Sequence, residues 1–153
     1  MNTSTVLNFP IAPKFLYNDR HSKIFNILSK IAFNVDPVGS ARIATAITFR
    51  NTIIAVGTNK KKTHPFQAQY GKNKESIYLH GEIDVIKNAL KFISQDELSR
   101  ASLYICRIKY YDETKKSLEF GLAKPCAGCE RAIATFGIKK VFYSLEKEGY
   151  QVL

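Results

Sequence analysis

The stretch ARIATAITFRNTIIAVGTN, residues 41–59, decides what kind of sheet this chain forms. Residues 41–50 have an alternating apolar character, and the β-forming residues 52–59 follow with almost no loop. The two segments therefore predict a β-hairpin that turns near Arg50 and Asn51. Because a hairpin brings antiparallel strands into the sheet, any strands that follow through helices make that sheet mixed rather than purely parallel.

The segments on either side of the hairpin alternate between helical and extended patterns. Before it, DRHSKIFNILSKIAFN predicts an amphipathic helix at about 19–34, which DPVGS ends. After it, HGEIDVIKNALKF, residues 80–92, predicts a second helix. The apolar face of that helix is expected to carry Ile83, Ile86, Leu90 and Ile93.

Beyond residue 100 the alternation continues. ASLYICRIKYY, residues 101–111, predicts a strand, and KKVFYS, residues 139–144, predicts another. Between them, KPCAGCERAIATF starts a helix with Pro125 in its first turn, and Gly137 ends it.

Other stretches lack such a pattern. Residues 60–76, KKKTHPFQAQYGKNKES, show no periodicity and are expected to form a long loop, and long loops in compact domains tend to be functional. Residues 111–121 are expected to form an exposed excursion, and 145–153 a short tail or edge strand.

The resulting order, α-β-β-α-β-α-β with one last strand, predicts an α/β fold in which helices cover both faces of a central mixed sheet. We expect one domain over residues 1–153, with an irregular N-terminal segment at 1–18. A chain of 153 residues can bury a stable core without disulfides.

The composition indicates the cellular location and the chemistry of the cysteines. No apolar run approaches the roughly 20 residues of a membrane span, and no signal-peptide pattern begins the chain, so we expect a cytoplasmic protein without a membrane partner. The odd count of 3 cysteines favours metal or redox chemistry at Cys126 and Cys129 over a disulfide framework. Cys106, in an apolar stretch, is expected to be a small buried hydrophobic residue.

The net charge of +10 would attract an anionic ligand, either a single phosphate or a polymer. Most basic residues are scattered, but the lysines at 60–62 form a cluster that Lys72 and Lys74 extend.

His80, Cys126 and Cys129 supply one nitrogen and two sulfurs, which are ligand types that zinc prefers. Residues three apart in the first turn of a helix face the same way, so both thiolates can reach one ion. Three protein ligands leave a fourth tetrahedral position for water. Two helix starts would then converge on one metal.

Glu82 follows His80 by two residues, so in helical geometry it can reach that water more easily than the metal. This position suggests a general acid/base. The alternative is a structural zinc site, for which His64 is the candidate fourth ligand; His21 is the only other histidine.

HGE at 80–82 and PCAGC at 125–129 resemble the motifs of the zinc-dependent cytidine/deoxycytidylate deaminase superfamily. The likeness in element order runs from about residue 19 to 144. It implies that His80, Cys126 and Cys129 bind Zn²⁺ and that Glu82 moves protons. It also implies a three-layer α/β/α sandwich around a sheet of about five strands, and a homo-oligomer.

The resemblance implies substrate contacts as well. In many members an asparagine that closes the second strand holds the sugar or the base; Asn59 has that position, although it could equally be a turn residue. The loop before His80 could line the pocket or form its lid through His64, Phe66, Gln67 and Tyr70. The short C-terminal part resembles the free-cytidine branch, whose last strands form a hairpin.

Three functions follow. The leading hypothesis is hydrolytic deamination of a cytosine-type base in a free nucleoside or nucleotide: water activated by zinc attacks C4, Glu82 protonates N3 and then the amine, and ammonia leaves. The second is the same reaction on single-stranded DNA, RNA or tRNA, which the charge supports but which lacks an aromatic-rich basic platform. The third is a non-catalytic, zinc-stabilised binding domain.

Overall fold

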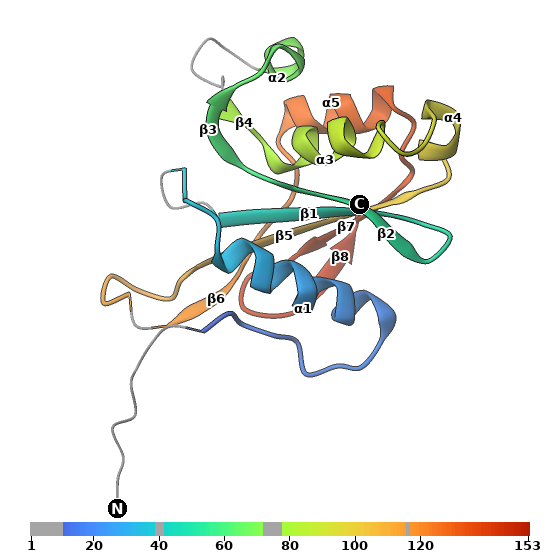
Figure 1. Ribbon diagram of the computed structural model, residues 1–153. Helices are drawn as coiled ribbons and strands as arrows, with labels where there is room; N and C mark the ends of the chain where they lie inside the picture. The colour runs from blue at the N-terminus through green and yellow to red at the C-terminus, as the bar shows by residue number, and fades with distance from the viewer. Residues whose placement is uncertain (1–10, 39–41, 72–77, 116) are drawn as a thin grey trace, which may run out of the picture.

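A computed structural model describes residues 11–38, 42–71, 78–115 and 117–153 (Figure 1). Residues 11–18 contain no helix or strand. The elements in chain order are α1 (Arg20–Phe33), β1 (Arg42–Phe49), β2 (Thr52–Thr58), β3 (Lys60–Thr63), α2 (Pro65–Tyr70), β4 (Tyr78–Leu79), α3 (Gly81–Ala89), α4 (Gln95–Leu98), β5 (Ser102–Tyr110), β6 (Leu118–Gly121), α5 (Ala127–Thr135), β7 (Lys140–Ser144) and β8 (Tyr150–Val152).

The main sheet is mixed, as the hairpin predicts. Its order is β2-β1-β5-β7-β8, and β6 pairs with the end of β5 beyond β7. Strand β7 runs parallel to β5, and the other pairs are antiparallel. The β1–β2 turn falls on Arg50 and Asn51, whose φ angles of 52° and 63° fit the right-handed twist of the hairpin.

Helices cover both faces of this sheet, which confirms the three-layer α/β/α architecture. In Figure 1, α1 lies on one side of the sheet, and α3 and α5 lie together on the other. The alternation along β5 explains the two layers: Tyr104 and Cys106 pack with α1, whereas Leu103 and Ile105 pack with α3 and α5. None of the described helices has the length and apolar composition that crossing a bilayer requires.

Two helices differ from the predicted ones. Helix α3 ends at Ala89, and Leu90, expected on its apolar face, is 37% exposed. A turn at residues 90–92 follows the helix, and Ser94 and Glu97 then form a capping box that starts α4. The N-cap of α5 is Cys126, so Pro125 precedes the helix instead of occupying its first turn.

The predicted loop at 60–76 is also corrected in part. Residues 60–63 form β3, which pairs with β4 in a separate two-stranded sheet, and α2 follows. The cap at His64 and the proline after it were signals for that helix start. Residues 72–77 lie outside the described part. The predicted excursion at 111–121 contains β6, where Phe120 is buried.

Gly57 lets α3 approach β2 closely. A Cβ at this position would lie 2.5 Å from the backbone nitrogen of Val85, 2.8 Å from the carbonyl oxygen of Gly81 and 2.9 Å from Oγ1 of Thr45. Real Cβ atoms do not approach neighbours this closely, so the first turn of α3 needs a residue without a side chain here.

Gly57→Ala should therefore lower the free energy of unfolding by roughly 1–3 kcal/mol, the usual cost of overpacking a core. Val56, 41% exposed, provides the matched control, because Val56→Ala truncates a side chain on the opposite face of the same strand. Urea denaturation of both variants measures the difference. Equal stability of the two variants would show that α3 can shift at little cost.

Candidate metal centre

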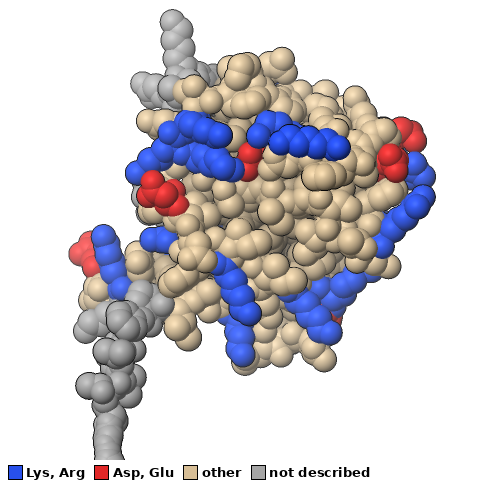
Figure 2. Space-filling model, in the orientation of Figure 1, with Lys and Arg blue, Asp and Glu red and all other residues tan. Residues whose placement is uncertain are grey.

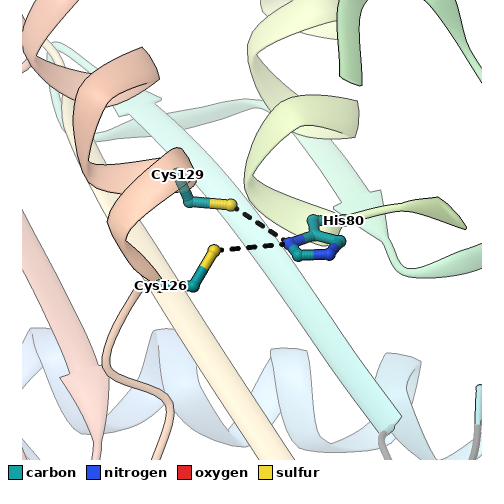
Figure 3. A group of neighbouring side chains, drawn as sticks. All are labelled: His80, Cys126 and Cys129. Atoms are coloured by element: carbon teal, nitrogen blue, oxygen red, sulfur yellow. Dashed lines mark hydrogen bonds between the residues drawn. The ribbon is translucent and has the colours of Figure 1, made fainter. Parts of the chain in front are cut away.

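The two predicted motifs meet where two helices begin. His80 is the N-cap of α3, Cys126 is the N-cap of α5, and Cys129 lies in the first turn of α5. In Figure 3 the imidazole of His80 points at both sulfur atoms. The α3–α5 layer thus gathers one nitrogen and two sulfurs from residues 46 to 49 positions apart in the chain.

The spacing of these atoms suits zinc. Nδ1 of His80 lies 3.3 Å from Sγ of Cys129 and 3.7 Å from Sγ of Cys126, and the three ligand atoms lie within 4.8 Å of one another. Tetrahedral zinc, with bonds of about 2.0–2.1 Å to nitrogen and about 2.3 Å to sulfur, separates such atoms by about 3.6 Å. Small movements would therefore let all three reach one ion.

The hydrogen bonds between these side chains shift their pKa values. Bonds from Cys129 and from His80 lower the pKa of Cys126 to about 3. The bond to Cys126 raises the pKa of Cys129, and burial raises it further. The bond to Cys126 also raises the pKa of His80. Cys126 is therefore already a thiolate near neutral pH. Since metal ligands must be deprotonated, binding a cation would release the protons that Cys129 and His80 carry.

Glu82 lies beside this group in the first turn of α3. Its side chain is buried, with the residue only 5% exposed, and its Oε2 lies 3.6 Å from Sγ of Cys129. Burial raises the pKa of its carboxyl group, because an apolar environment disfavours the charged form. A carboxyl group in this position can exchange protons with a molecule that enters the centre.

Buried polar contacts, which the sequence did not reveal, hold the first turn of α3 on the sheet. Thr45, on β1, donates a 2.8 Å hydrogen bond to the carbonyl oxygen of Gly81. Asp84 is 1% exposed, accepts the Thr58 N–H at 3.0 Å and pairs with Lys60. An acidic residue inside the apolar run IDVI was the signal that could have revealed this anchor.

The pairing with Asp84 changes the interpretation of the lysine cluster. Lys60 is held against a buried carboxylate and so contributes less free positive charge than the sequence suggests. Lys72 and Lys74 lie outside the described residues. Figure 2 shows basic side chains spread over the visible face instead of forming one continuous track.

The predicted substrate residues have different environments. Asn59 is 6% exposed, and its Oδ1 accepts the Ile43 N–H at 2.9 Å, so this oxygen bridges the ends of β1 and β2. Gln67 is 1% exposed, and its Oε1 accepts the backbone N–H of His80 at 2.9 Å. It therefore contacts the backbone of a residue of the group and not the side chains that converge there. Phe66 and Tyr70 pack against the apolar cluster that contains Cys129.

The other histidines are not part of the group. Nδ1 of His64 accepts the Phe66 N–H at 3.0 Å as the cap of α2. His21 lies in the α1 layer, stacked on Phe142 and hydrogen-bonded to the Tyr104 hydroxyl at 2.6 Å. Cys106, also in that layer, is fully buried as predicted, and burial raises the pKa of its thiol.

Comparison with known proteins agrees with this geometry. Residues 18–145 match the family model of the cytidine and deoxycytidylate deaminase zinc-binding region. The chain therefore belongs to this family of zinc-dependent deaminases.

No curated protein matches the chain. Among solved structures, the dCMP deaminase from the cyanophage S-TIM5 in apo form is similar, with 19% identity and a TM-score of 0.42. The match covers 68% of this chain and 66% of that one, so this chain spans slightly less than two thirds of its length. Similarity this distant does not identify a substrate.

His64→Ala tests whether this histidine is a fourth ligand. We expect wild-type zinc stoichiometry, because the imidazole caps α2 and is not part of the group of His80, Cys126 and Cys129. Zinc content measured by mass spectrometry, with His21→Ala as the control, decides the matter. Loss of zinc from the His64 variant alone would instead indicate a closed structural site.

Proposed function

We propose that this chain, as a single deaminase domain, hydrolyses the amino group of a cytosine-type base in a free nucleoside or nucleotide. The observation that carries the proposal is the position of Glu82, a buried carboxyl group that lies beside the three-residue group and contacts Cys129. A structural zinc site does not require such a group, whereas hydrolysis requires one that moves protons.

In this proposal His80, Cys126 and Cys129 hold the metal. When bound, zinc supplies a Lewis acid that lowers the pKa of a water molecule toward roughly 7. The reaction forms a C4–O bond, breaks the C4–N bond and releases ammonia. Glu82 accepts a proton from the water and delivers it to N3 of the base. It then takes the remaining proton from the new C4 hydroxyl group and passes it to the departing amine. Its raised pKa favours this role, because the carboxyl group can carry a proton nearer neutral pH.

Two observations favour a small substrate over a polynucleotide. Strands β7 and β8 form an antiparallel hairpin, the arrangement expected for the free-cytidine branch. Basic side chains are spread over the face seen in Figure 2, and Lys60 is already paired with Asp84. A polynucleotide would be better served by a continuous basic groove with aromatic side chains for stacking.

Glu82→Gln keeps the size of the side chain but removes its ability to accept a proton. We expect it to lower the rate of ammonia release by roughly 10²–10⁴-fold while zinc stays bound. Glu130→Gln, which changes an acidic residue in the first turn of α5, is the matched control and should retain activity. Full activity of the Glu82 variant would rule out the assigned role.

A substrate panel tests the class of molecule. Cytidine, deoxycytidine, their monophosphates, modified cytosines, guanine, adenosine and single-stranded oligonucleotides are each assayed for ammonia at two salt concentrations. We expect turnover of a free cytosine compound with little salt dependence. Turnover confined to oligonucleotides and falling steeply with salt would favour the polynucleotide alternative, since phosphate contacts release counterions.

Assembly and location are separate expectations. The homo-oligomer and the cytoplasmic location stay predictions, which light scattering of the purified protein and cell fractionation would test.

A further inference from the structure

Helix α2 lies next to both segments that carry the metal group, the chain that leads into His80 and helix α5. It follows β3, whose partner β4 leads directly into His80, and it packs on α5 (Figure 1). Phe66 and Tyr70 contact the apolar cluster of Leu79, Ile83, Cys129 and Ala132, which includes residues from both motif helices. The ring of Phe66 also lies 5.4 Å from that of Phe136, at the far end of α5.

The first anchor from α2 is a hydrogen bond that α3 cannot make for itself. In a capping box, the third residue of a helix accepts the N–H of the N-cap residue. The third residue of α3 is Ile83, which has no acceptor, and the side chain of His80 faces the cysteines. Oε1 of the fully buried Gln67 accepts the His80 N–H instead, at 2.9 Å.

The second anchor joins α2 to the start of α5. The carbonyl oxygen of Tyr70, the last residue of α2, accepts a 3.0 Å hydrogen bond from Nη2 of Arg131. The same oxygen lies against Gly128, so close that a Cβ there would collide with it. Ala127 and Gly128 lie between Cys126 and Cys129, and the missing side chain of Gly128 lets α2 approach the CxxC turn.

We propose that α2 is a positioning element for the metal centre: Gln67 orients the His80 backbone, and Tyr70, seated against Gly128 and Arg131, sets the position of the cysteines relative to it. The proposal rests on the metal-ligand assignment made under the proposed function. It does not require a particular substrate, because the anchors act on ligand geometry.

Gln67→Met and Gln67→Glu test the first anchor. Methionine keeps the length of the side chain and lacks the acceptor, whereas glutamate keeps an acceptor oxygen at the same place. The matched control is Gln69→Met, an exposed position of the same helix. Zinc affinity is measured by competition with a chelator, and ligand geometry by the absorption spectrum of the cobalt-substituted protein.

We expect Gln67→Met to weaken zinc binding roughly 10-fold or more, in the range known for groups that orient metal ligands, and to change the cobalt spectrum. Gln67→Glu should keep the wild-type cobalt spectrum, because the acceptor oxygen remains and a negative charge alone would not preserve the ligand geometry. Gln69→Met should match the wild type in both measurements. Wild-type affinity and spectrum in Gln67→Met would overturn the proposal.

Arg131→Met tests the second anchor and provides an answer should Gln67→Met fail to fold. Arg131 is exposed, so its replacement leaves the core intact. Removing a positive charge would by itself strengthen cation binding. Weaker zinc binding therefore supports the loss of a positioning contact, and unchanged or tighter binding counts against it.

The two proposals fail in different ways. A wild-type protein that binds zinc but releases no ammonia from any substrate of the panel contradicts the deaminase function and leaves the role of α2 standing if Gln67→Met still weakens binding. A wild-type protein that binds no zinc overturns the metal-ligand assignment and the role of α2 together.

Discussion

The structure depends on one constraint: two helices begin at residues whose side chains are turned toward each other. His80 and Cys126 are the N-caps of α3 and α5, and neither makes a side-chain capping hydrogen bond. Each helix start leaves backbone N–H groups without partners inside the helix, and leaving such groups buried and unpaired is costly. The neighbouring elements must supply contacts that these helices lack. At the start of α3, Gln67 supplies the acceptor for the His80 N–H, which is why a polar side chain from α2 lies buried there.

Three buried polar side chains make hydrogen bonds that hold the start of α3 in place. Thr45 holds a carbonyl group from the side of the sheet, Asp84 ties the same turn to the end of β2, and Gln67 holds the His80 backbone from α2. Two glycines also bring the elements together. Gly57 lets β2 approach α3 and Gly128 lets α5 approach α2, where a methyl group would separate each pair. The candidate site therefore combines a first turn held by several hydrogen bonds with side chains from the starts of two separate helices, an arrangement suited to fixing the distances between candidate ligand atoms.

The two faces of the sheet have different tasks. On the α1 face, His21, Tyr104 and Phe142 stack together around a core that includes Cys106, so a histidine and a cysteine are used there for packing. On the other face, the same residue types converge on the metal centre. The division follows from the alternation along β5, whose successive side chains point to opposite layers. Residue type alone could not separate the two uses, because His21 lies in the first turn of α1 just as Cys129 lies in the first turn of α5.

By itself, the sequence determined the order of the main elements and the mixed sheet, and it predicted the four side chains that the structure brings together, because periodicity, a tight hairpin and two short motifs are local properties of the chain. It did not predict β3, α2 or β6, since segments of four to six residues show no measurable period and form by pairing with distant partners. It placed Gln67 in the pocket or its lid and Lys60 in a basic cluster, but it did not reveal that Gln67 accepts the His80 N–H or that Lys60 pairs with Asp84. Only the tertiary structure decided these roles, because a hydrogen bond between residues 13 apart and an ion pair between residues 24 apart depend on how the elements pack.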